Sequence, residues 1–131
     1  MQRHCENTST IAHFLNSHPK IEKVYWPGFE SHPNHKVAKA QMKDYGGMLS
    51  FITKGANYEA AISIVERLKL FTLAESLGGV ESLAGHPASM THASIPKKVR
   101  EKSGVVDALI RLSVGIEDVR DLISDLEKAI G

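Results

Sequence analysis

The segment 108–115 constrains the fold of this chain most strongly, because its apolar residues recur at every second position, as in a half-buried β-strand. One face of this strand is apolar, and the opposite face carries Arg111 and Ser113. An arginine in such a strand needs an anionic partner or water, and its planar guanidinium can hold a carboxylate through two parallel hydrogen bonds. The segment therefore predicts a sheet whose second face presents Arg111 to a ligand. A structural ion pair is the open alternative.

A second segment, 72–82, has a strand-like apolar start that ends abruptly at Glu75 and Ser76, with Gly78 and Gly79 close behind. Glycines adopt backbone angles that cost other residues energy, and they leave space beside the backbone of Ser76 for a small polar group. We predict that Ser76 and Arg111 converge on the carboxylate of an amino acid. The alternative for the Gly-Gly pair is an ordinary turn.

Around these two segments, helix-like and strand-like patterns alternate along the chain. Strands are expected at 21–26, 48–53, 70–74 and 108–115, and an irregular segment at 81–92. Helices are expected after the capping candidates Asn7, Thr8 and Ser9, at 35–42, at 58–68 behind a cap at Asn57, from Pro96 to Gly104, and at 119–130. This order predicts an α/β fold with a sheet of about four strands and helices packed mainly on one face.

Composition narrows the classes of protein to which the chain can belong. Its 131 residues suit one compact domain, and a net charge of +1 provides no global field that would attract nucleic acid or an anionic membrane. The single cysteine, Cys5, fits a reducing compartment, and no apolar run resembles a signal region or a membrane span, so we expect a cytoplasmic protein. His32 and His35 have no further ligand cluster to complete a metal site, so none is expected.

Three stretches carry a resemblance to a known family: FTLAESLGGVESL at 71–83, MTHA at 90–93 and IRLSVGIED at 110–118. They resemble, in order and spacing, the trans-sulfuration enzymes. This is the Cys/Met-metabolism family of enzymes that depend on pyridoxal 5'-phosphate (PLP), and it includes cystathionine γ-lyase, γ-synthase and β-lyase and methionine γ-lyase. YWPG at 25–28 and the pair His32-Pro33 also resemble this family.

The resemblance covers the whole chain but only the C-terminal part of such an enzyme. Residues 1–17 resemble the end of the helix that joins the large and small domains, and 18–131 resemble the small C-terminal domain of fold-type I PLP enzymes. In the family, the cofactor lysine and the phosphate-binding residues belong to the large domain. The resemblance therefore implies PLP in the full-length enzyme. It implies no catalytic or cofactor-binding residue in this chain, which alone is expected to be inactive and free of PLP.

Site residues follow from the same resemblance. It implies that Arg111 binds the α-carboxylate of the substrate and that Ser76 assists through its backbone. Glu75 would lie near the distal end of the substrate, with Thr91 near the same pocket. His92 could line that pocket or make a structural hydrogen bond to the backbone.

The implied reaction is closest to that of cystathionine γ-lyase, which eliminates the sulfur of cystathionine and gives cysteine, 2-oxobutanoate and ammonia. Two alternatives stay open: a cystathionine γ-synthase domain, and a non-catalytic fragment that only self-associates. The family also implies a homo-oligomer. Without the large domain, we expect exposed apolar surface around Met48, Phe51 and the segment 70–77.

Overall fold

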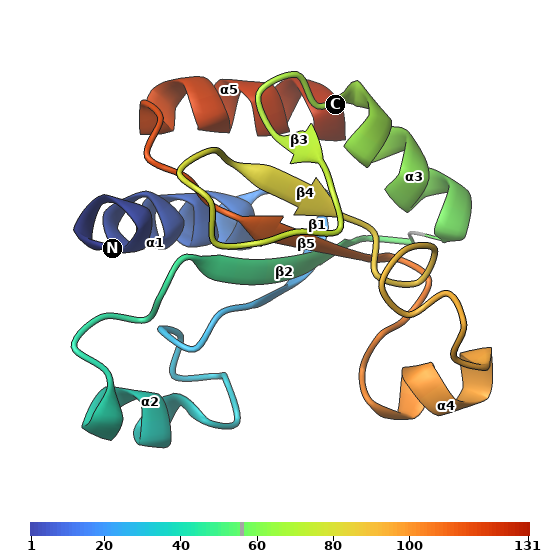
Figure 1. Ribbon diagram of the computed structural model, residues 1–131, viewed down its shortest axis with the longest axis horizontal. Coiled ribbons are helices and arrows are strands. Elements are labelled where there is room, and N and C mark those ends of the chain that lie inside the picture. Colours follow the sequence, from blue (N-terminus) through green and yellow to red (C-terminus); the bar gives the residue numbers. More distant parts are fainter. Residues whose placement is uncertain (56) are drawn as a thin grey trace.

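The computed structural model describes residues 1–55 and 57–131 and shows a five-stranded mixed sheet with five helices in these ranges (Figure 1). The strands are β1 (Ile21–Tyr25), β2 (Met48–Thr53), β3 (Thr72–Leu73), β4 (Leu83–Gly85) and β5 (Leu109–Ser113). The helices are α1 (Gln2–Ser17), α2 (His35–Gln41), α3 (Tyr58–Arg67), α4 (Lys97–Lys102) and α5 (Val119–Ile130). None of these described helices is long and apolar enough to cross a membrane. The predicted α/β class is confirmed.

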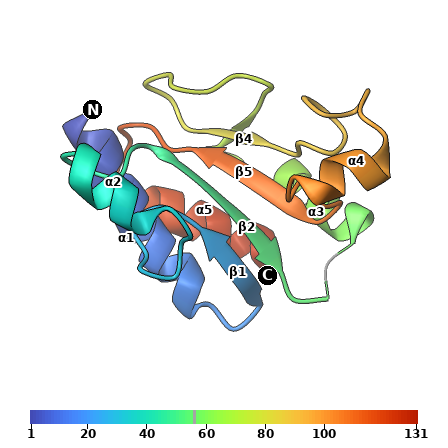
Figure 2. The same ribbon diagram turned by 90° about the horizontal axis from the view of Figure 1, so that it is seen from below.

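The strands lie in the order β1-β2-β5-β4-β3, and neighbours are antiparallel except for the parallel pair β3 and β4. Three helices, α1, α3 and α5, cover one face of this sheet (Figure 1). The other face is turned toward the viewer in Figure 2, where α2 and α4 stand at its two sides and leave the middle strands in view. We call it the open face.

The covered face holds the hydrophobic core, which the alternation of side chains along the strands builds. In β5, Ile110 and Leu112 are completely buried, as their period of two predicts. In β2, buried and half-buried positions alternate in the same way. Phe51 is one of the buried ones, with no exposed surface. Our expectation that Phe51 lies on an exposed apolar surface was therefore wrong, because its side chain points to the face that the helices cover.

The sheet contains one strand more than the four expected. The additional strand, β4, lies inside the segment 81–92, which we expected to be irregular. All three of its residues are buried, so no alternation of apolar and polar residues marks it in the sequence. The strand expected at 70–74 is shorter, and forms only β3 at the edge of the sheet.

The polar residues 7–9 do not cap the first helix, because α1 begins before them. Asn7 is instead buried within α1, and its Nδ2 donates hydrogen bonds to the carbonyls of Gly115 at 3.0 Å and Glu117 at 2.8 Å. These bonds fasten α1 to the connection between β5 and α5. The predicted cap of α3 is confirmed, since the Asn57 side chain accepts a backbone N–H of that helix at 2.9 Å.

Candidate functional site

Arg111 stands in the middle of β5 on the open face, between Ser50 of β2 and Gly85 of β4. A Cβ atom built on Gly85 would lie 3.8 Å from Nη2 of Arg111, so the guanidinium leans over a position that has no side chain. Arg111 is half-buried, and its side chain makes no hydrogen bond or ion pair with the residues that the structure describes. Its five N–H donors are therefore available to an anion that this part of the chain does not supply.

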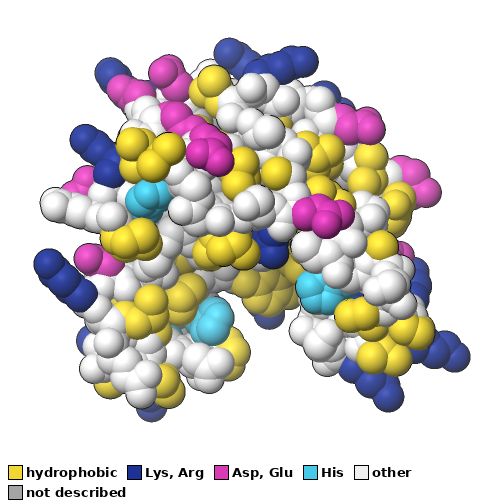
Figure 3. Space-filling model, in the orientation of Figure 1, with side chains coloured by type: hydrophobic (Ala, Val, Ile, Leu, Met, Phe, Trp, Pro, Cys, Tyr) yellow, Lys and Arg dark blue, Asp and Glu magenta, His cyan; other side chains and the backbone are white. Residues whose placement is uncertain are grey.

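A narrow crevice adjoins Arg111, too tight in this structure to hold a water molecule, and it brings together three of the four residues predicted for the site. We call it the small pocket. Glu75 follows β3, Thr91 lies in the turn after β4, and Arg111 comes from β5. Figure 3 shows this side of the molecule hollowed between the ends that carry α2 and α4, with a basic side chain at the roof of the hollow and histidines on its two walls. Ser76 is exposed and does not line the pocket, so its contact with a substrate stays a prediction.

The segment 75–79, which we call the site loop, reaches β5 through Gly78. The backbone N–H of Gly78 donates a hydrogen bond of 2.8 Å to Oγ of Ser113. Gly78 has φ = +79°, in the left-handed region where a side chain is strained, so this turn favours glycine. The predicted glycine turn thus connects the loop that carries Glu75 and Ser76 to the strand that carries Arg111.

His86 is a residue of the pocket wall that the sequence interpretation missed. It is completely buried, and its Nε2–H donates to the Asp107 carbonyl at 2.6 Å. With the proton on Nε2, Nδ1 accepts a hydrogen bond of 2.8 Å from the Ser89 hydroxyl. His86 therefore joins the turn that carries Thr91 to the connection that enters β5. Both partners are distant in sequence or lie in irregular segments, so no periodic pattern could have indicated them.

The carboxylate of Asp107 is held by two cations of the α4 region. Lys97 contacts it with Nζ at 2.5 Å from Oδ2, and the buried Arg100 contacts Oδ1. The hydrogen bonds from Lys97 and Arg100 lower the pKa of Asp107 below its ordinary value. Since the folded-state pKa is lowered, this contribution to stability is present above the ordinary pKa of an aspartate and is lost as the pH falls through the lowered one.

His92 contacts the hydroxyl of Thr91 rather than a backbone group. Its Nδ1 lies 2.8 Å from Thr91 Oγ1, and His92 does not line the small pocket. The structural hydrogen bond of His92 is thus made with a side chain, and its place at the substrate pocket of the complete enzyme stays a prediction.

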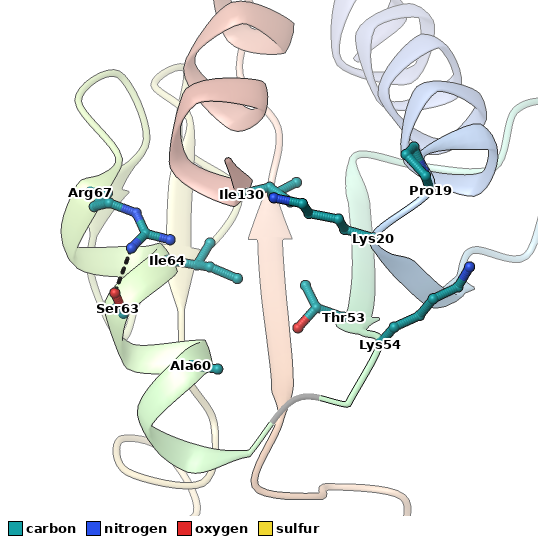
Figure 4. Close-up of a pocket in the computed structure, with 9 residues that line it drawn as sticks. All are labelled: Pro19, Lys20, Thr53, Lys54, Ala60, Ser63, Ile64, Arg67 and Ile130. Carbon is teal, nitrogen blue, oxygen red and sulfur yellow. Dashed lines mark hydrogen bonds between the residues drawn. The ribbon is translucent and has the colours of Figure 1, made fainter.

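A second, larger cavity lies between α3 and the ends of β1 and β2 and has a basic lining (Figure 4). Two of its cations already bind carbonyls at the end of α5, Arg67 that of Ala129 and Lys20 that of Gly131. Such contacts stabilise the negative end of a helix. The third cation, Lys54, points away from the cavity in Figure 4. The basic residues of this cavity are therefore explained by the packing of α5, and they do not indicate an anion-binding site. Among the described residues, no group of three His, Cys, Asp or Glu side chains could hold a metal ion.

The fold and the site define an α/β domain that presents an arginine on an open sheet face, beside a pocket with a carboxylate and a hydroxyl. The model of the family of Cys/Met metabolism PLP-dependent enzymes matches residues 1–131, and the chain belongs to this family.

Its relatives include enzymes with different names at nearly equal similarity. The chain is 54% identical to the L-methionine gamma-lyase of Fusobacterium nucleatum subsp. polymorphum, 55% to the cystathionine beta-lyase of Coxiella burnetii and 53% to the cystathionine gamma-lyase of Dictyostelium discoideum. Each match covers 99% of this chain and 33% of the relative. The crystal structure of metB from Corynebacterium glutamicum matches with a TM-score of 0.91 and 49% identity, over 99% of this chain and 33% of that one. The chain thus spans about a third of the length of its relatives.

The residues that line the small pocket do not by themselves fit the cofactor of the family. PLP enzymes attach the cofactor to a lysine. Every lysine of the described chain is exposed, and none lines the pocket beside Arg111. What this face offers is an arginine, a carboxylate and a hydroxyl, which suit the polar ends of an amino acid.

Proposed function

We propose that this chain is the C-terminal domain of a PLP-dependent carbon–sulfur lyase that cleaves cystathionine at its γ-carbon. Residues 1–17 would end the helix from the large domain, and 18–131 would form the small domain. The observation that supports this function best is Arg111, which lies on the open face with its donors unused by the described residues. Family membership supplies the reaction class.

In this proposal, the domain binds and orients the substrate. The guanidinium of Arg111 holds the α-carboxylate through two hydrogen bonds, and the backbone of Ser76 adds a polar contact. Fixing the carboxylate fixes the direction of the bonds at the α-carbon, so that a reacting group meets them in the productive geometry. PLP, held by the part of the enzyme outside this chain, would supply an electron sink for the amino acid. We also propose that the complete enzyme is a cytoplasmic homo-oligomer, as is usual for the family that the sequence resembles.

The chain alone is expected to be inactive. Incubated with PLP and cystathionine, it should form no 2-oxobutanoate above a buffer blank, because the pocket contains no lysine for the cofactor. Intact mass after borohydride reduction should show no stoichiometric attachment of PLP at one lysine. Turnover, or one PLP bound at a single lysine, would show that the cofactor site lies in this chain. The matched positive sample is the complete enzyme, which should release cysteine and 2-oxobutanoate together.

Glu75 is the residue proposed to favour cystathionine over methionine. The far end of cystathionine carries an ammonium that a carboxylate attracts, whereas methionine ends in a methyl group that would leave the carboxylate unpaired. In the complete enzyme, Glu75→Ala should lower kcat/KM for cystathionine relative to methionine by up to about fivefold, the value of an exposed ion pair. Glu127→Ala, which changes an exposed glutamate of α5 on the covered side of the sheet, is the control and should keep the ratio. If Glu75→Ala leaves the ratio of kcat/KM for cystathionine to that for methionine unchanged, Glu75 is a solvent-exposed residue without a role in substrate choice.

A further inference from the structure

Between its two ends, the site loop, residues 75–79, makes few hydrogen bonds with the rest of the described chain. Its hydrogen bond from Gly78 N–H to Ser113 Oγ, at 2.8 Å, is the only one that these five residues make with other described residues. Glu75, Ser76 and Leu77 are exposed, so burial adds little to fix them. Just outside the loop, the Ala74 N–H donates to the Ala84 carbonyl at 3.0 Å, and the Val80 carbonyl accepts from the Ile116 N–H at 2.9 Å. The ends of the loop are therefore anchored, and the Ser113 hydroxyl fixes the turn between them.

Ser113 is well placed to control the site, because it is itself rigid. It is 3% exposed and lies in β5, paired with Met48 of β2 on one side and Leu83 of β4 on the other. Two residues along a strand return to the same face, so Ser113 and Arg111 both point to the open face, about 7 Å apart. The hydroxyl of Ser113 thus joins the turn of the site loop to the same strand that carries Arg111.

We propose that Ser113 is a positioning residue, which holds the site loop beside Arg111 so that the site is preorganised to bind the substrate carboxylate. This inference rests on the proposed function of Arg111. A loop without this hydrogen bond samples more conformations, and each residue ordered on binding costs conformational free energy. That cost appears in substrate binding, because Ser113 touches neither the substrate nor the bonds that react.

The test compares Ser113→Ala with the parent in the complete enzyme. A hydrogen bond of this kind contributes about 1 kcal/mol, so KM for cystathionine should rise about fivefold while kcat changes less than twofold. Hydrogen exchange at the Gly78 amide should accelerate by a similar factor, while the Val114 amide, bonded to the Gly47 carbonyl, keeps its rate. Ser17→Ala removes an exposed hydroxyl at the end of α1 and is the control for both measurements.

Two further variants separate positioning from packing. Ser113→Thr keeps the hydroxyl and should retain KM, whereas Ser113→Cys keeps the volume with a weaker acceptor and should shift KM and exchange in the direction of alanine. If Ser113→Ala does not fold, the cysteine variant carries the same test. Unchanged hydrogen exchange at Gly78 in both Ser113→Ala and Ser113→Cys would overturn the inference. Faster exchange with an unaltered KM would also overturn it, provided that Arg111→Lys raises KM. If neither Ser113→Ala nor Arg111→Lys changes KM, the proposed function of Arg111 fails, and the inference that rests on it fails too.

Discussion

Arg111→Lys in the complete enzyme is expected to lower kcat/KM for cystathionine at least about tenfold, although the charge is kept. Lysine presents a point charge on a flexible stem and cannot form the two parallel hydrogen bonds that a guanidinium makes with a carboxylate. The loss of one charge-assisted hydrogen bond is worth about 1.5–3 kcal/mol, and 1.4 kcal/mol corresponds to a factor of ten in rate. Steady-state kinetics with cystathionine measure the effect directly.

The fold should not contribute to this loss. Arg111 is half-buried, leans over Gly85 and has no partner among the described residues, so its replacement breaks no internal bond. The urea midpoint of the variant should therefore match that of the parent. Arg120→Lys is the matched control, since this arginine lies in α5, on the covered side of the sheet, and its side chain is 86% exposed. Full efficiency in Arg111→Lys would make Arg111 a structural residue and remove the main support for the proposed function.

Asp125→Ala is expected to lower the free energy of unfolding by about 3 kcal/mol, the largest effect on stability predicted for this chain. Asp125 is a buried carboxylate of α5, and it accepts backbone hydrogen bonds from Lys69, Leu70 and Phe71, three consecutive residues that lead into β3. Alanine leaves these N–H groups without their acceptor. Water can serve as the acceptor for the amides of the exposed Lys69 and Leu70, but it cannot reach the amide of the buried Phe71.

Urea unfolding followed by circular dichroism measures this change. Glu127→Ala in the same helix removes an exposed carboxylate and should alter the free energy of unfolding by no more than about 0.5 kcal/mol. Asp125→Asn keeps one acceptor oxygen, so its free energy of unfolding should lie between those of Asp125→Ala and Glu127→Ala. If Asp125→Ala were as stable as the Glu127 control, the contact between α5 and the entry to β3 would contribute nothing to the fold.

Much of the architecture follows from local patterns in the sequence. A strand-like run bounded by glycines placed β2 at its observed bounds. Alternation along 108–115 assigned Ile110 and Leu112 to the core and Arg111 to the opposite face. The cap of α3 at Asn57 is equally local, because a side chain bonds a backbone N–H three residues away. These features depend on neighbours within a few residues, so the sequence carries them directly.

Tertiary structure decided the features that depend on which distant segments become neighbours. The strand β4 exists because it pairs with β3 and β5, and its own three buried residues give no periodic signal. His86 and Asp125 are polar residues in buried positions, and only their partners, tens of residues away, explain them. The contact of Gly78 with Ser113 is of the same kind. The sequence indicated the arginine and the glycine turn separately, and the fold joined them because backbone and hydroxyl groups pair only after the sheet has brought them together.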